Sequence, residues 1–134
     1  LAVVFEQPNS LSLRRLGLNA PGDADVVVEV RWSGISTGTA RLLWTGRMPG
    51  FPGMGYPLVP GYESVGRVTD AGVNSRARLG EWVFVPGSRC FRGANGLFGG
   101  AAQRVVIPSV RAMAVPERLG EKGVLLALAA TAMH

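Results

Sequence analysis

The chain has 134 residues, of which 47% are hydrophobic and 17% charged, so it is long enough for one domain with a buried core and too apolar for a disordered protein. Its net charge of +5 is carried almost entirely by arginine. These arginines are scattered and do not alternate with aromatic residues, which argues against nucleic-acid binding and favours an anionic small molecule or a solvated surface.

Apolar, β-prone runs separated by turn residues predict a mainly β fold. In chain order, the expected strands are residues 1–5, 11–18, 26–35, 63–69, 82–85, 101–107 and 110–115. The first two are expected to pair with each other, and residues 26–35 give the strongest signal because apolar and polar side chains alternate along them. Nineteen glycines and nine prolines predict many turns, and short strands around such turns are typical of a partly open β-barrel.

Two helices are predicted among these strands. Residues 37–44 contain good helix formers, and Thr37 or Thr39 is expected to cap their first turn. Residues 122–133 carry apolar side chains at helical spacing. Residues 93–99 are rich in glycine, but no strand leads into a helix there, so we do not expect them to bind a dinucleotide.

Residues 58–69 join a turn, a carboxylate and a strand. Pro60 fixes φ near about −65° and removes a backbone donor, so it marks the entry to a strand rather than its centre. Glu63 stands at that entry. Its carboxylate is either held by nearby backbone donors or an arginine, or takes part directly in catalysis. Gly66 predicts a β-bulge or the close approach of another backbone.

The sequence carries one cysteine, Cys90, which excludes an internal disulfide and fits a reducing compartment. No apolar run reaches the roughly 18 residues that can span a bilayer, and no basic leader precedes an apolar core. These features predict a cytoplasmic protein. They do not decide between a monomer and a homo-oligomer.

The segment 60–63 (PGYE), followed by 65–68 (VGRV), resembles a motif in the N-terminal, GroES-like catalytic domain of medium-chain dehydrogenases/reductases. Further motifs of that domain follow in the same order at residues 33–39, 80–85, 99–103 and 129–132. The resemblance implies that residues 1–134 form a GroES-like, partly open barrel. In this superfamily a dinucleotide-binding domain follows the catalytic domain, and this chain is expected to stop before it.

Zinc-dependent members of the superfamily bind a catalytic zinc ion through two cysteines and a histidine. Ser36, Tyr62 and Ala127 stand at those three positions, so the resemblance implies a zinc-independent enzyme. No metal site is expected from the remaining candidate ligands, which are Cys90, His134 and Glu63.

Without a metal ion, oxidation of an alcohol needs a side chain that takes the hydroxyl proton while a hydride passes to nicotinamide. The resemblance points to Ser36, Tyr62 and Glu63 for this chemistry, with Tyr62 in the place of the lost histidine. The alternative for Tyr62 is a packed ring whose hydroxyl bonds to the backbone. Thr37 and Thr131 are the residues expected near the cofactor, NAD, although helix capping and packing would also explain them.

Residues 15–18, 42–47 and 51–57 resemble dehydrogenases that act on bacteriochlorophyllide, which implies oxidation of a 1-hydroxyethyl group to acetyl on a flat tetrapyrrole. Three apolar side chains, Met48, Phe51 and Met54, would contact the macrocycle. Either Arg41 or Arg47 would bind its carboxylate. Alternatively, the loop at residues 46–57 packs over the barrel. Two other functions stay open: a zinc-free quinone or enoyl reductase using NADPH, and a barrel that binds a pigment or partner without catalysis.

Overall fold

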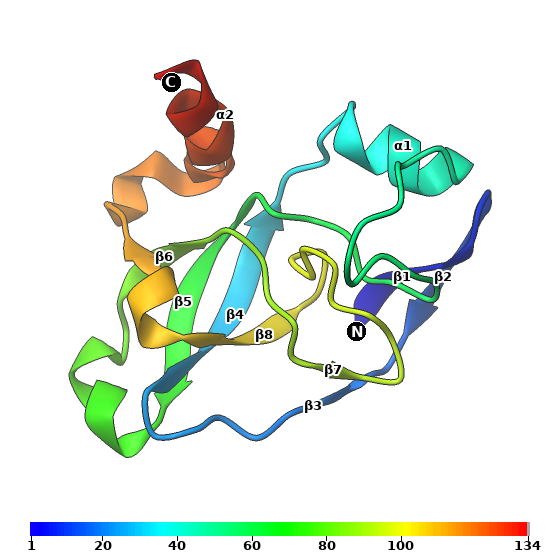
Figure 1. Ribbon diagram of the computed structural model, residues 1–134. Helices are drawn as coiled ribbons and strands as arrows, with labels where there is room; N and C mark the ends of the chain where they lie inside the picture. The colour runs from blue at the N-terminus through cyan, green and yellow to red at the C-terminus, as the bar shows by residue number, and fades with distance from the viewer. Residues whose placement is uncertain (134) are drawn as a thin grey trace.

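The computed structural model describes residues 1–133 and has a mainly β fold with few short helices (Figure 1). The strands are β1 (Ala2–Gln7), β2 (Ser10–Arg14), β3 (Gly17–Leu18), β4 (Asp25–Ser33), β5 (Ser64–Ala71), β6 (Trp82–Val85), β7 (Phe91–Arg92), β8 (Arg104–Pro108) and β9 (Met113–Ala114). The α-helices are α1 (Thr39–Thr45) and α2 (Leu126–Ala132). Three 3₁₀ helices are η1 (Val73–Arg78), η2 (Ser109–Arg111) and η3 (Glu117–Leu125).

Five strands form the main sheet in the order β8-β4-β5-β6-β9, and all neighbours are antiparallel. The long strands β4 and β5 pair Ser33 with Ser64, so the segments that follow β4 and precede β5 leave the sheet side by side. Gly66 lies so close to β4 that a Cβ there would stand 2.1 Å from the Glu29 carbonyl oxygen. The predicted close approach at Gly66 is therefore confirmed, and β4 carries a register irregularity opposite it.

Two small sheets flank the main one. β1 pairs with β2, as predicted, but the strand expected over residues 11–18 is divided, because β3 pairs with β7 instead. Isolated bridges join Ala2 to Ala102 and Phe5 to Leu58, which tie β1 to the rest of the fold. Within residues 1–133 no ladder joins the edge strands β8 and β9, so the barrel is partly open, as expected.

The core divides into three clusters. The main one gathers valines from β4, β5, β6 and β8 and includes Cys90, which is 4% exposed. A second cluster lies under α1 and is built on Phe5, Leu43, Leu58 and Leu97. A third joins Val65, Trp82 and Phe84 to η3 and α2. Burial of these side chains is the main force that holds the short strands together.

Both predicted helices exist, but each begins differently from the prediction. Gly38 occupies the N-cap of α1, so capping by Thr37 or Thr39 is wrong. The helix expected from residue 122 is 3₁₀ up to Leu125 and α-helical only afterwards. Gly120, at φ 52° and ψ −132°, breaks the regular turn just before that segment.

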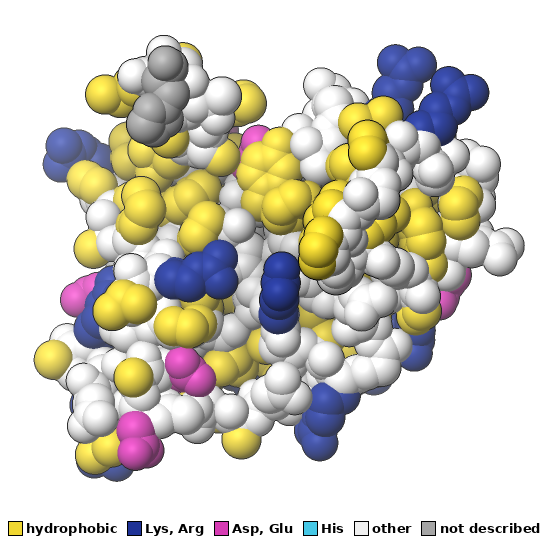
Figure 2. Space-filling view, in the orientation of Figure 1, with side chains coloured by type: hydrophobic (Ala, Val, Ile, Leu, Met, Phe, Trp, Pro, Cys, Tyr) yellow, Lys and Arg dark blue, Asp and Glu magenta, His cyan; other side chains and the backbone are white. Residues whose placement is uncertain are grey.

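Figure 2 shows Lys and Arg side chains singly or in small groups over one face, without a continuous basic patch. Hydrophobic side chains gather in the upper part of the same view, below α2 and between α2 and α1. None of the helices within residues 1–133 is long and apolar enough to cross a membrane.

Candidate functional site

A cleft of about 880 Å³ lies between α1, the segment joining β4 to α1, and the residues just before β5. Its walls include Phe5, Leu43, Trp44 and Phe98. The polar side chains that line it between β4 and β5 are Ser36, Thr37, Thr39, Arg41, Tyr62 and Glu63. A large, mostly apolar cavity with a few converging polar groups is the usual form of a small-molecule site.

Ser36 and Tyr62 meet because of the strand register. Residues 34–36 continue from the end of β4 while residues 61–63 lead into β5, so they remain neighbours beyond the sheet. The Tyr62 hydroxyl donates a hydrogen bond of 2.6 Å to Ser36 Oγ, and Thr39 Oγ1 lies 3.4 Å from the Tyr62 oxygen. Three hydroxyl groups therefore form one cluster on the wall of the cleft.

The ring of Tyr62 is held by Phe98, whose ring packs edge-on at a centroid distance of 5.1 Å. The packing alternative for Tyr62 is confirmed for the ring and wrong for the hydroxyl, which bonds to a serine side chain rather than to the backbone. The glycine-rich residues 99–101 support this arrangement by binding along residues 59–61. Their N–H groups donate to the carbonyls of Val59 (3.0 Å), Gly61 (2.7 Å) and Pro60 (2.8 Å), respectively.

Glu63 is the unusual group of the site. Its side chain is buried, at 5% exposure, and Oε1 has no hydrogen-bond partner among residues 1–133. The expected anchoring of this carboxylate by backbone donors or an arginine is therefore wrong for Oε1. Burial raises the pKa of the Glu63 carboxyl above its ordinary value, because the charged form loses hydration. A buried carboxyl facing a cleft can exchange a proton or bind a polar ligand atom.

Gly34 makes room for this carboxyl. Its N–H donates to the Glu63 carbonyl at 2.6 Å, and a Cβ at this position would lie 2.5 Å from Glu63 Oε2. The glycine at residue 34 therefore has a local steric reason, since any larger residue would displace the Glu63 side chain.

The other predicted site residues divide into two groups. Thr37 and Arg41 line the cleft. Met48 and Met54 pack against the second core cluster, as the packing alternative for the loop expected. The residues that do not line the cleft are Arg47, Met48, Phe51, Met54 and Thr131.

Thr131 lies on α2, where its Oγ1 donates to the Ala127 carbonyl at 3.0 Å, a bond within the helix. His134, considered as a candidate ligand, lies outside the described residues.

Sequence reasoning missed several cleft residues, among them Trp44, Phe98 and Gln103, and for Thr39 it favoured helix capping over a hydrogen bond to substrate. Gln103 belongs to residues 99–103, which resemble a motif of the dehydrogenase family. Nothing in that motif indicated that the Gln103 side chain would line the cleft.

Neither a metal site nor a dinucleotide site is found among the described residues. Within residues 1–133 no three His, Cys, Asp or Glu side chains are grouped to hold a metal ion. Gly96 and Gly99 lie against the backbone of residues 88–89, so part of the glycine-rich segment serves packing. Strand β8, rather than a helix, follows that segment, which does not fit the pyrophosphate of a dinucleotide.

Comparison with known proteins supports the fold and the family. The family model of the alcohol dehydrogenase GroES-like domain matches residues 22–117. A crystal structure described as a short chain alcohol dehydrogenase of Escherichia coli CFT073, complexed with NADH, matches with a TM-score of 0.74 and 25% identity. That match covers 93% of this chain and 41% of the solved one.

Two curated relatives are each 51% identical to this chain. Both are named 2-desacetyl-2-hydroxyethyl bacteriochlorophyllide A dehydrogenase. One is from Cereibacter sphaeroides, where the match covers 99% of this chain and 43% of the relative, and the other is from Rhodobacter capsulatus, with 98% and 42%. The chain therefore spans less than half the length of these relatives.

Proposed function

The chain belongs to the alcohol dehydrogenase GroES-like domain family, and we propose that it is the catalytic domain of a zinc-independent bacteriochlorophyllide dehydrogenase. The reaction would oxidise a 1-hydroxyethyl side chain to acetyl. The names of the two curated relatives support this substrate. The residues at the family's zinc positions support independence from zinc, because Ser36, Tyr62 and Ala127 are poor zinc ligands.

The cofactor proposed for this oxidation is NAD, whose nicotinamide accepts a hydride from the alcohol carbon. The turn that joins β4 to α1, residues 34–38, lacks the G-x-G-x-x-G pattern, and the glycine-rich residues 93–99 are followed by strand β8, so we propose that the dinucleotide binds mainly to a separate domain. Thr37 lines the cleft and would lie beside the reacting end of the cofactor. A similar role for Thr131 would require that the second domain close over α2.

The observation that carries the proposal is the hydrogen bond from Tyr62 to Ser36 in an apolar cleft. Because the Tyr62 hydroxyl donates to Ser36, its oxygen keeps two lone pairs, so it can accept the hydroxyl proton of a substrate alcohol beside its 3.4 Å contact with Thr39. One proton then moves from substrate to Tyr62, one from Tyr62 to Ser36, and one from Ser36 to water. Glu63 Oε1 supplies a further position at which a polar atom of the ligand can be bound.

The test is a chimera in which this chain replaces the matching region of the Rhodobacter capsulatus relative. We expect it to convert the hydroxyethyl pigment to the acetyl pigment with NAD, and to remain active after dialysis against a chelator. Tyr62→Phe should lower kcat by about 100-fold or more, since positioned proton transfer contributes roughly 10²–10⁴-fold. The matched control is Tyr56→Phe, because the Tyr56 hydroxyl bonds to the Leu43 carbonyl and does not line the cleft.

Restoration of activity only by added zinc would contradict a zinc-independent reaction. Equal kcat values for Tyr62→Phe and the wild-type chimera would remove Tyr62 from the chemistry. Pigment binding without any turnover would favour a non-catalytic pigment-binding barrel instead.

A further inference from the structure

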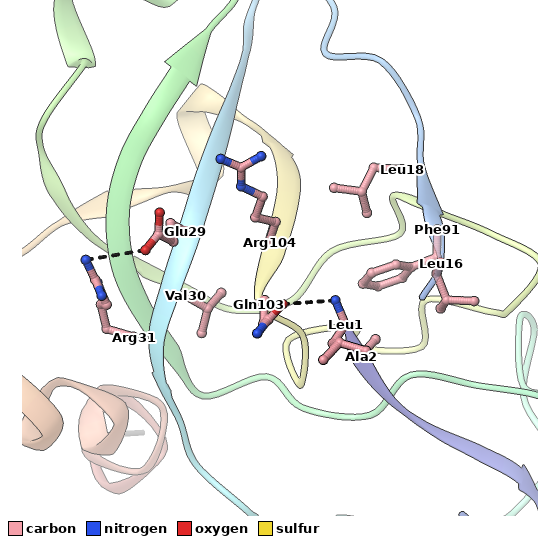
Figure 3. A pocket seen from close by; sticks show the side chains of 10 residues that line it. All are labelled: Leu1, Ala2, Leu16, Leu18, Glu29, Val30, Arg31, Phe91, Gln103 and Arg104. Carbon is pink, nitrogen blue, oxygen red and sulfur yellow. Dashed lines mark hydrogen bonds and ion pairs between the residues drawn. The ribbon is translucent and has the colours of Figure 1, made fainter. Parts of the chain in front are cut away.

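A second cavity, of about 470 Å³, lies next to the cleft (Figure 3). One wall is apolar and is formed by Leu16, Leu18 and Phe91. Leu18 and Phe91 are brought together by the pairing of β3 with β7, the connection that the sequence did not predict. This small sheet therefore creates an apolar surface opposite the ends of β4 and β8.

The polar side of this cavity carries two arginines, Arg31 and Arg104. Arg31 pairs with Glu29 at 3.3 Å. Arg104 is the register partner of Glu29 on β8, yet among residues 1–133 no carboxylate lies within ion-pair distance of its guanidinium. Glu29 also lines the cavity, but its carboxylate pairs with Arg31, so Arg104 lies beside the apolar wall with no ion pair among residues 1–133. Its planar fork matches a carboxylate.

The two cavities share part of their lining. Five residues belong to both: Leu1, Ala2, Val30, Arg31 and Gln103. The Val30 N–H donates to the Gln103 carbonyl at 2.9 Å. Figure 3 shows the side chains of Val30 and Gln103 between the Arg31 and Leu16 sides of the cavity. A broad flat ligand can therefore lie over this shared boundary, with one edge at the hydroxyl cluster and another at Arg104.

We propose that Arg104, supported by Arg31, binds the carboxylate of an amphipathic, flat apolar substrate whose hydroxyl group lies at Tyr62 and Ser36. This inference rests on the proposed function, since a bacteriochlorophyllide has a tetrapyrrole plate with a free carboxylate at its edge. It replaces the earlier assignment of that role to Arg41 or Arg47. Arg47 does not line either cavity, and Arg41 lines only the cleft.

The proposal is tested by titrating the 134-residue chain with a hydroxyethyl chlorophyllide as the free acid and, separately, as its methyl ester. Quenching of tryptophan fluorescence reports binding, because Trp44 lines the cleft. We expect the free acid to bind about 10-fold more tightly than the ester at low salt, and added salt to reduce that difference. Arg104→Gln should lower the affinity for the free acid to that of the ester and leave ester binding unchanged.

The matched control is Arg111→Gln, an exposed arginine in η2 that lines neither cavity, and we expect it to bind both pigments like the wild type. Thermal unfolding of each variant checks that the fold is retained. Equal binding of acid and ester, or a loss of selectivity in Arg41→Gln but not in Arg104→Gln, would overturn this inference while leaving pigment binding in place. Failure to bind either pigment would overturn the proposed substrate as well.

Discussion

The two ends of the β4–β5 pair differ in how fully their charged side chains are hydrogen-bonded. At the end away from the cleft, Arg78 bonds to Glu81 at 2.8 Å, to the Ala112 carbonyl at 2.8 Å and to Ser109. At the cleft end, Glu63 is buried and Oε1 has no partner among the described residues. A buried polar atom without a hydrogen bond lowers stability, so the cleft end is poorly explained by folding alone and better explained by ligand binding.

The largest expected effect is at the end stabilised by Arg78. Arg78→Met keeps the apolar stem but removes the bonds that join η1 to the β8–β9 connection. We expect the free energy of unfolding to fall by about 2–4 kcal/mol, since hydrogen bonds to charged groups contribute roughly 1.5–3 kcal/mol each and are not additive. Urea denaturation measures this, with the exposed neighbour Arg76→Met as control. Equal losses in both variants would show that Arg78 has no special structural role.

A smaller loss is expected at the cleft end from Gly34→Ala. The new Cβ would collide with the Glu63 side chain, and insertion of a methyl group into such a packed place costs about 1–3 kcal/mol. In a Glu63→Gly background the same change should cost much less, because Glu63 Oε2 and Cβ, which would lie 2.5 and 2.9 Å from the new Cβ, are both absent. A double-mutant cycle by urea denaturation gives the coupling. Additive losses would mean that Gly34 is required for its backbone and not for Glu63.

Substitution of two glutamates by glutamine should change stability at pH 7 in opposite directions. Burial raises the folded-state pKa of Glu63, so its favourable contribution is complete below the unfolded-state pKa of about 4.3 and is lost as pH rises through the folded-state pKa. Glu63→Gln should therefore raise stability at pH 7 and leave it nearly unchanged at low pH. Glu81→Gln should instead lower stability at pH 7, because the Glu81 carboxylate pairs with Arg78. Thermal midpoints measured from pH 3 to 8 would contradict this if both variants shifted alike.

The strands and the centre of the site were predictable because they depend on local patterns. Alternating side chains identified β4, and the turn at Pro60 identified the start of β5. Antiparallel pairing of these two strands then brings Ser36 to Tyr62. The resemblance to a known family added the expectation that these residues share a site.

The other features of the fold and the site depend on contacts between segments far apart in the sequence. No local pattern of residues predicts such contacts. Met48 and Met54 suit a ligand surface and a core equally well, and only the position of α1 places them in the second cluster. The pairing of β3 with β7 is a match of two residues on each side, too short to recognise in advance. Likewise, the lack of a partner for Glu63 Oε1 among residues 1–133 depends on all the segments that pack around it.

The most direct test of a functional cleft end compares two pigments that differ only in the hydroxyl group, one with a 1-hydroxyethyl and one with a vinyl side chain. We expect the 134-residue chain to bind the hydroxyethyl pigment about 10-fold more tightly, equivalent to one hydrogen bond of roughly 1.4 kcal/mol. Tyr62→Phe should abolish that preference without changing affinity for the vinyl pigment. Equal affinity of the wild-type chain for both pigments, or a preference that survives in Tyr62→Phe, would contradict the assignment of the hydroxyl cluster as the alcohol-binding site.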